Sequence, residues 1–436
     1  MKEDNYFWKY KYEPGKKKNK KSKDIKKVKP LVSIITSYYN SNEYMWQTIN
    51  CVLNQTFQSW EWIIVDDGST NKEAIQYLKD VEKIDERIKI YHKENGGLAL
   101  GRDYAIKYST TKYILPLDAD DLIEPTYIET LYWALETNKE ASWAFTNSVG
   151  FGKYIYLFDV KFDSEKMKTD NHITATSLIR KEKILELGGY GKAKRYMNED
   201  WYLWLRMLAD NQFPVQVGYY GFWYRRRNES LLTEINDEKK KEYELKMKDI
   251  KDIAEKIDNK IEAISYPKEK IDISKIKNNE EINIKNIEDI EILEKTRDGY
   301  LYILPYLGTD KKMYKKIKKQ SEKKKIYIVT TQKNVHSEYL YRQKYEQFST
   351  VYDLTTFLDE ENWIGFIKYV LKTRSIKKIF LSNTMYNEEL KKKFDVIQIE
   401  DCKNSKFIYK CNILKYKFMN CFVIRVIIKL GRILKG

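Results

Sequence analysis

The sequence of 436 residues contains little cysteine and histidine, and these shortages exclude several classes of protein. Its four cysteines show no paired spacing, so we expect no disulfide framework and a reducing compartment. With only three histidines, the chain cannot assemble a cluster of zinc ligands. No window holds 18 uninterrupted apolar residues, and the N-terminus has no apolar segment for a signal peptide. We therefore expect a cytoplasmic protein without a spanning helix.

The excess positive charge lies at the two ends of the chain. The net charge is +16, of which residues 1–30 carry +8 and residues 403–436 carry +9, leaving −1 for everything between. A nucleic-acid-binding protein would carry a basic face on its folded part, so we expect no nucleic-acid partner. Basic tails suit peripheral binding to an anionic surface on the inner face of the cell membrane, and solvated tails without a partner are the alternative.

Short apolar runs alternate with helical periodicity from residue 30 onward. This alternation predicts an α/β domain with a mainly parallel sheet. The expected strands are Leu31–Ile35, Trp60–Val65, Ile88–Tyr91 and Tyr113–Leu117, with helices at about 43–54 and 98–109.

The pattern changes after residue 234. Apolar residues spaced by three or four predict one long amphipathic helix over 236–264, and 265–297 has the charged, irregular texture of a linker. A second α/β pattern then begins, with expected strands at Tyr300–Leu304, Lys325–Thr331, Thr350–Leu354, Lys378–Ser382 and Asp395–Ile399. We expect five sections: a basic arm (1–29), an α/β domain (30–234), a helix and linker (235–298), a smaller Rossmann-like domain (299–402) and a basic C-terminal helix (403–436).

Acidic residues follow the predicted strands of the first domain. Asp66 and Asp67 follow one strand, and Asp118, Asp120 and Asp121 follow another. Open parallel sheets place their ligand crevices at these strand ends, and clustered carboxylates repel one another unless a cation lies between them. Mg²⁺ or Mn²⁺ typically takes one or two carboxylates together with phosphate oxygens of a substrate. The pattern therefore predicts a divalent cation and a phosphate-bearing ligand.

Five motifs in order resemble the inverting glycosyltransferases of family 2, over about residues 31–232. The match is carried by Val32–Asn40 with Gln55-Thr56, Glu61–Thr70, Asn95–Arg102, Asp118–Asp121, and Glu199-Asp200-Trp201 with Trp204 and Arg206. The resemblance implies a GT-A fold, a Rossmann-like nucleotide-sugar-binding domain with a mixed, mainly parallel sheet. It also implies transfer of a sugar, commonly from a uridine diphosphate carrier, to a hydroxyl of a glycan or lipid-linked acceptor in surface polysaccharide synthesis.

The resemblance also assigns roles to individual residues. The donor would be bound by Ser37, Tyr39, Asp67, Gly96, Arg102 and Asp118, with Tyr39 against the base and Asp67 on the nucleoside. The metal would be held by Asp120 with Asp118, and Asp200 would be the general base, with Glu199 as the reserve. Arg225 and Arg227 would close over the diphosphate, and Trp201, Trp204 and His172 would lie on the acceptor side.

Plainer interpretations exist for these residues. Asp66–Thr70 has the composition of an ordinary strand-to-helix turn, Glu199 and Asp200 suit any helix start, and Trp201 and Trp204 fit a protein core. Two departures from the family pattern also stand out: Thr36-Ser37-Tyr38 replaces the usual proline after the first strand, and Tyr202 stands where an acid is common.

Two other functions fit parts of the pattern. A sugar nucleotidyltransferase would show a Gly-rich phosphate loop with a lysine after the first strand, which Ser37–Asn40 does not provide. A scaffold with a decayed site would have lost its acids, which are intact. Gly299–Leu307 and the strands after it resemble the first lobe of family 4 glycosyltransferases, which implies a non-catalytic accessory domain. Residues 413–435 suit either a helix on an anionic membrane or a helix docked on the second domain.

Overall fold

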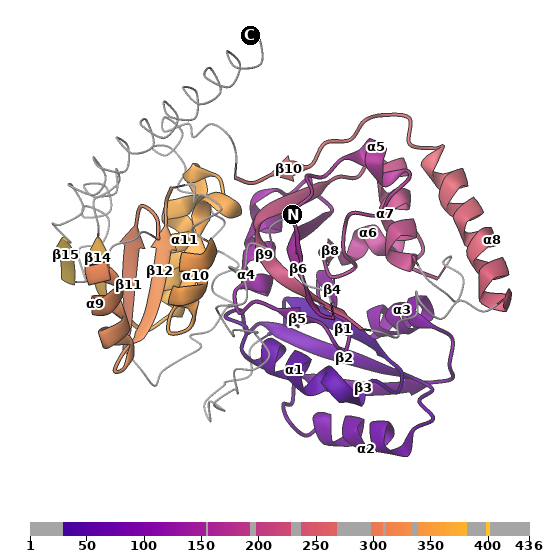
Figure 1. The fold of residues 1–436 in the computed structure, drawn as a ribbon, viewed down its shortest axis with the longest axis horizontal. Coiled ribbons are helices and arrows are strands. Elements are labelled where there is room, and N and C mark those ends of the chain that lie inside the picture. The colour runs from indigo at the N-terminus through magenta and orange to yellow at the C-terminus, as the bar shows by residue number, and fades with distance from the viewer. Residues whose placement is uncertain are drawn as a thin grey trace, which may run out of the picture. The chain divides into compact units, whose positions relative to one another are not determined.

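The computed structural model describes residues 29–153, 156–191, 198–227, 237–267, 298–307, 311–332, 339–381 and 398–401. The basic arm and the basic C-terminal helix expected from the sequence lie outside these residues. The chain forms two compact units (Figure 1). Unit 1 comprises residues 1–296 and 353–375, and unit 2 comprises 297–352 and 376–436.

Unit 1 is built on a mixed sheet of ten strands. Their order along the sheet is β10-β9-β6-β8-β4-β1-β2-β3, with β5 paired to β9 and β7 to β6. The strands are β1 (Val32–Tyr38), β2 (Trp60–Asp67), β3 (Ile88–Lys93), β4 (Tyr113–Pro116), β5 (Leu122–Ile123), β6 (Trp143–Gly152), β7 (Tyr156–Phe158), β8 (Leu178–Arg180), β9 (Pro214–Arg226) and β10 (Ile264–Ser265). The first four strands pair in parallel, and β8 joins them antiparallel to β4 and β6.

The parallel half of the sheet is covered on both faces, as its sequence predicts. Every residue of β2 is buried, and β1 is buried except for the half-buried Ser37, because strands between two layers of helices have no polar face. The helices of unit 1 up to β9 are α1 (Asn42–Leu53), α2 (Lys72–Val81), α3 (Leu98–Tyr108), α4 (Tyr127–Thr137), α5 (Ser164–Met167), α6 (Lys181–Glu186) and α7 (Glu199–Ala209). The GT-A-like α/β fold expected for this domain is confirmed.

The expected long helix is shorter than its periodicity suggested, and it belongs to the first domain. Helix α8 spans Asp237–Ala254, and the chain then runs to β10 at the edge of the sheet. The apolar face of α8 contributes Ile250 and Ala254 to the core cluster that contains Leu205 and Leu208 of α7. Residues 237–265 therefore complete the sheet domain, and most of the linker expected over 265–297 lies outside the described residues.

The segment 353–375 also belongs to unit 1, although its sequence position suggested the second domain. It contains two short 3₁₀ turns (Leu354–Thr356 and Glu360–Asn362) and α11 (Trp363–Thr373). Phe366 and Tyr369 of α11 pack edge-on against Trp133 of α4. A periodic apolar helix can cover any apolar surface, so its partner could not be deduced from the sequence.

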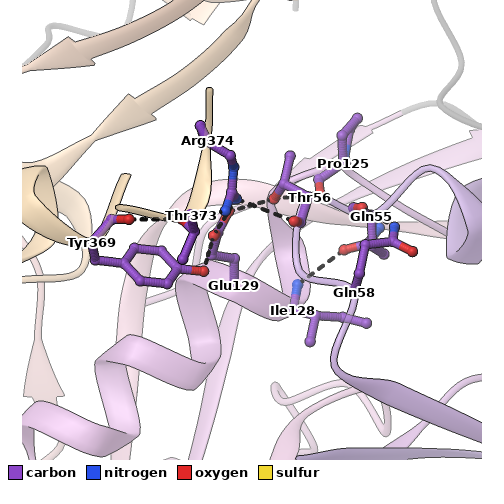
Figure 2. A network of polar contacts seen from close by, with 9 residues as sticks. All are labelled: Gln55, Thr56, Gln58, Pro125, Ile128, Glu129, Tyr369, Thr373 and Arg374. Atoms are coloured by element: carbon purple, nitrogen blue, oxygen red, sulfur yellow. Dashed lines mark hydrogen bonds and ion pairs between the residues drawn. The ribbon is translucent and has the colours of Figure 1, made fainter. Parts of the chain in front are cut away.

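A buried polar network fixes α11 to α4 (Figure 2). The carboxylate of Glu129 accepts hydrogen bonds from the Tyr369 hydroxyl (2.5 Å), the Arg374 guanidinium (2.6 Å) and the Thr56 hydroxyl (2.5 Å). Arg374 also donates to the Thr56 carbonyl at 3.1 Å. Glu129 is fully buried, so its carboxylate has lost its hydrogen bonds to water. The three donors replace those hydrogen bonds, and the guanidinium also provides an opposite charge.

The Gln55-Thr56 motif has a structural role at the same place. The Gln55 side chain donates to the Glu124 carbonyl (2.9 Å) and accepts from the Ile128 amide (3.1 Å), which joins the end of α1 to the start of α4 (Figure 2).

Unit 2 contains a second, five-stranded sheet with the order β13-β12-β11-β14-β15. Pairings β11–β12, β11–β14 and β14–β15 are parallel, so the expected Rossmann-like sheet is confirmed. The elements are β11 (Gly299–Leu304), α9 (Lys311–Ser321), β12 (Lys325–Thr330), α10 (Tyr339–Glu346), β13 (Thr350–Asp353), β14 (Ile376–Leu381) and β15 (Gln398–Asp401). In the described parts of both units, no helix is long and apolar enough to cross a membrane.

Candidate active site

Three polar segments meet at one edge of the unit 1 sheet because the strands before them are parallel. They follow β1, β2 and β4, which lie side by side in the sheet. Asn40 connects the first two segments: its side-chain oxygen accepts hydrogen bonds from the Thr70 and Asn71 amides at 3.1 and 2.9 Å. Asn40 adopts a left-handed backbone conformation (φ 48°), which asparagine tolerates better than most residues. The sequence analysis gave this residue no role.

Asp67 anchors the glycine-rich loop before α3. Its carboxylate accepts hydrogen bonds from the backbone amides of Gly96 (3.0 Å) and Gly97 (2.7 Å) and pairs with the Lys93 ammonium. Gly68, at φ 75°, lies so close to Asn95 that an added Cβ would come within 2.7 Å of its backbone nitrogen. Asp67 and Gly96 are thus brought together as expected. Lys93 is an additional charged residue here that the motif did not reveal.

Tyr39 and Ser37 lie in different environments. Tyr39, directly after β1, is 47% exposed, so its ring is available for contact with a planar ligand. Ser37 lies against α3, where a Cβ on Gly101 would come within 2.1 Å of its hydroxyl oxygen. Gly101 therefore permits the close approach of α3 to β1, and Ser37 forms part of that packing contact.

Arg102 connects the two acidic motifs. Its guanidinium donates to Asp118 at 2.9 Å and to Glu199 at 2.5 Å, and only 1% of the residue is exposed. Burial lowers the pKa of Arg102, but the two carboxylates outweigh that effect and hold it above its usual value. Arg102 was expected on the donor. The structure shows it paired with Asp118 and Glu199, where it holds the strand-end loop of Asp118 against the first turn of α7.

Asp120 and Asp121 differ in their partners. Asp120 forms an ion pair with Arg227 at 2.5 Å, whereas Asp121 is buried and accepts a hydrogen bond from the Arg225 amide at 2.8 Å. Burial raises the pKa of Asp120, Arg227 lowers it, and the neighbouring Asp118 raises it.

Arg225 has a structural position. Its guanidinium donates to the Asp120 carbonyl (2.7 Å) and to Gln47 (2.8 Å), and lies over the rings of Tyr44 and Phe151. Arg227 is 41% exposed at its side chain and is the better placed of the two expected arginines to meet a diphosphate.

Asp200 lies in the first turn of α7, which begins after a left-handed Asn198 (φ 58°). Its carboxylate accepts hydrogen bonds from the Asn171 side chain (3.2 Å) and the Trp201 amide (2.8 Å). Burial and the adjacent Glu199 raise the pKa of Asp200 to about 7, against the opposing effect of Arg102. A carboxylate with a pKa near neutrality is suited to accept a proton at physiological pH.

The three residues expected on the acceptor side are part of the core, which corrects that expectation. Trp204 is fully buried and stacked on Trp143 at 5.3 Å, and Trp201 is 6% exposed with its indole donating to the Met167 carbonyl. His172 is 3% exposed, and its ring nitrogens bind the Asp163 amide and the Asp170 carbonyl. Their side chains stabilise α7 and the loop before it, since apolar rings spaced by three on one helix face favour burial.

The carboxylates at the sheet edge suit a hard divalent cation in the chemistry of their ligand atoms. Within the described ranges, no cluster of three or more His, Cys, Asp or Glu side chains forms a metal site. Asp118 and Asp120 offer only oxygen ligands, and their mutual repulsion favours an added positive charge. They therefore fit a cation held by one or two protein carboxylates together with ligand oxygens.

Comparison with known proteins identifies the family of the chain. The family "Glycosyl transferase family 2" matches residues 33–184. A glycosyltransferase of Methanocaldococcus jannaschii with no assigned reaction is 31% identical over 205 residues, which cover 43% of this chain and 68% of that protein. On this similarity, the chain belongs to glycosyltransferase family 2 and is a glycosyltransferase.

Some relatives are named for polysaccharide synthesis. An O-antigen biosynthesis glycosyltransferase of Escherichia coli is 28% identical over 197 residues, 42% of this chain and 74% of that protein. A Bacillus subtilis glycosyltransferase named for teichuronic acid biosynthesis is 42% identical over 119 residues, 27% of this chain and 46% of that protein. This match thus spans about half of the relative. Among solved structures, S. aureus TarS 1–349 in complex with UDP-GlcNAc aligns with a TM-score of 0.41 and 18% identity, over 50% of this chain and 66% of that one.

Proposed function

We propose that the protein transfers a sugar from a nucleoside-diphosphate sugar to a hydroxyl of a glycan or lipid-linked acceptor, with inversion at the anomeric carbon. The observation that carries this proposal is Asp200, a carboxylate with a pKa of about 7 at the start of α7, connected through Glu199 and Arg102 to Asp118. This arrangement supports a general base on the Asp200 side of the site and a diphosphate on the Asp118 side.

The proposed roles follow from these positions. Tyr39 lies against the base of the nucleotide, and Asp67 holds both the glycine-rich loop and the nucleoside. Asp200 removes the proton from the acceptor hydroxyl as its oxygen attacks the anomeric carbon, while the bond to the diphosphate breaks. The electron pair of that bond leaves with the diphosphate. Arg227, paired with Asp120 at 2.5 Å, would stabilise the charge that develops there.

Asp120, assisted by Asp118, would hold Mn²⁺ or Mg²⁺. When bound, the ion would supply positive charge that stabilises the departing diphosphate. Because Asp120 is already paired with Arg227, ion binding and the position of Arg227 are coupled in this proposal.

The competing functions predict different behaviour. A nucleotidyltransferase would use a phosphate loop carrying a lysine after β1, but that position holds Tyr39 and Asn40, with Asn40 bound to the next loop. A binding scaffold would not need a carboxylate raised to a pKa of about 7 beside a second acid.

The first experiment measures thermal stabilisation and turnover with a panel of nucleotide sugars, with and without Mn²⁺. We expect one donor to stabilise the protein in a metal-dependent manner. Asp120→Ala should remove the metal dependence, and Asp200→Asn should keep donor binding but lose transfer. No shift with any donor, in protein shown to be folded, would contradict the proposal and favour a scaffold.

A further inference from the structure

One buried cation near the proposed base comes from outside the motifs that define the family. Lys246 lies on α8, after the residues matched by the family, and only 1% of it is exposed. Among the described residues its ammonium has no hydrogen-bond partner. A buried lysine without a partner is costly, so its retention in the charged form requires nearby negative charge.

The packing of α8 places Lys246 at the start of α7. Ile250, one turn further along α8, belongs to the same core cluster as Trp201 and Leu205 of α7. The Lys246 ammonium lies 5.6 Å from the centre of the Tyr202 ring, two residues after Asp200. Residues four apart share one face of a helix, so Lys246 and Ile250 both face α7. The ammonium is also close enough to Glu199 and Asp200 for both carboxylates to raise its pKa.

Carboxylates outnumber the cations around the first turn of α7. Asp118, Glu199 and Asp200 are three carboxylates, and Arg102 pairs with the first two. Among the described residues, Asp200 accepts hydrogen bonds from two neutral donors, the Asn171 side chain and the Trp201 amide. A second buried cation nearby would favour the state in which all three carboxylates are ionised.

We propose that Lys246 is a positioning residue for the general base: α8 holds its ammonium beside the Glu199–Asp200 pair, where it favours the charged form of Asp200. The inference rests on the proposed function for the role of Asp200, but the charge interaction itself does not. It makes α8, which lies outside the matched family region, part of the machinery that prepares the base.

The other charged and titratable groups near this pair act in known directions. Burial lowers the pKa of Lys246, while Glu199, Asp200 and Asp249 raise it and Arg206 lowers it. Asp200 is also close enough to the phenols of Tyr190 and of Tyr224, on β9, to raise their pKa. Those phenols stay neutral near pH 7. Among the described residues, the other charged groups that act on this pair or on Lys246 are Arg102, Arg206 and Asp249, and Asp118 pairs with Arg102.

A double-mutant cycle tests the interaction without any substrate. The full-length protein is unfolded in urea as wild type, Lys246→Met, Asp200→Asn and the double variant, at pH 8 and pH 5.5. Above pH 7 Asp200 is ionised, so removing Lys246 should lower the urea midpoint more at pH 8 than at pH 5.5. In the Asp200→Asn background that pH dependence should disappear. Effects that are additive at both pH values would overturn the proposal.

A kinetic experiment tests the consequence for the base. The probe is hydrolysis of whichever UDP-sugar stabilises the protein, with Mn²⁺, and with water in place of the acceptor. Removing a cation raises the pKa of a carboxylate, so Lys246→Met should move the acidic limb of kcat/KM to higher pH, by up to about one pH unit. Lys246→Arg should restore the wild-type limb.

The matched control is Lys248→Met, the same change on the exposed side of α8. It should leave both the urea cycle and the pH profile unchanged. A profile that shifts equally in both lysine variants would overturn the specific role of Lys246. Absence of hydrolysis by the wild type with every donor would contradict the proposed function, while the urea cycle would still decide the role of Lys246.

Discussion

The buried carboxylate of Glu129 offers a direct test of how the late segment 353–375 supports the catalytic domain. Glu129→Gln changes the charge with little change in shape. The amide can still accept a hydrogen bond from Tyr369, and its nitrogen can donate to the Thr56 hydroxyl. What is lost is the negative charge beside Arg374, which is only 4% exposed. The variant therefore removes the carboxylate charge that Glu129 places 2.6 Å from this buried guanidinium.

The expected cost follows from that geometry. Breaking a buried ion pair by removing one partner costs about 3–5 kcal/mol, because the remaining charge is desolvated and unpaired. Removing both charges with Glu129→Gln and Arg374→Met should recover more than half of this loss, since neutral replacements of buried pairs are often tolerated. The double variant still lacks the hydrogen bond from Arg374 to the Thr56 carbonyl, so full recovery is not expected.

Tryptophan fluorescence in urea isolates the relevant unfolding event. All ten tryptophans of the chain lie within residues 1–296 and 353–375, so the signal reports unit 1 alone. The free energy of unfolding is obtained by linear extrapolation for the wild type, both single variants and the double variant. A loss below about 1 kcal/mol for Glu129→Gln would refute the reasoning. So would a double variant that is less stable than either single variant.

Three further predictions concern the site and the ends of the chain. Arg102→Met should raise the pKa of Asp200 above about 7 and move the pH–rate profile to higher pH, since Arg102 now lowers that pKa; an unshifted profile would contradict this. Trp204→Ala should destabilise unit 1 by about 3–5 kcal/mol in urea and Trp204→Phe by much less; weakened acceptor binding at unchanged stability would restore the acceptor-side interpretation. If residues 413–436 bind membrane, deleting them should release the protein from anionic liposomes in sedimentation, and unchanged partitioning would leave them a structural role.

The sheet elements could be predicted from sequence because their signal is local. Buried parallel strands such as Trp60–Asp67 need continuous apolar residues, and the acids that follow them mark the strand ends. The local sequence of an apolar helix does not show which surface the helix covers. Helix α11 has the same pattern whether it covers α4 or a strand of unit 2, so its place in unit 1 was not predictable.

The site was predictable to the level of motifs but not of contacts. Asp67 and Gly96 meet as the motif implies, because the loop between them is short and glycine-rich. The sequence could not show that Arg102 turns toward Glu199 and not outward, since a buried guanidinium depends on two carboxylates 97 and 16 residues away. The sequence pattern of Trp201 and Trp204 is the same for an exposed acceptor platform as for a buried core. Only the stacking of Trp204 on Trp143 distinguishes the core from the platform.

The path of the chain through the two units has a consequence for synthesis on the ribosome. Unit 1 needs Asp353–Ser375 for completion, but 79 residues separate Thr296 from Ser375. At about 5–20 residues per second, some 4–16 s pass between those two points. During that interval Glu129 and Trp133 lack the α11 side chains that cover them in the finished fold. The nascent catalytic domain therefore presents an apolar helix face to chaperones before its last helix arrives.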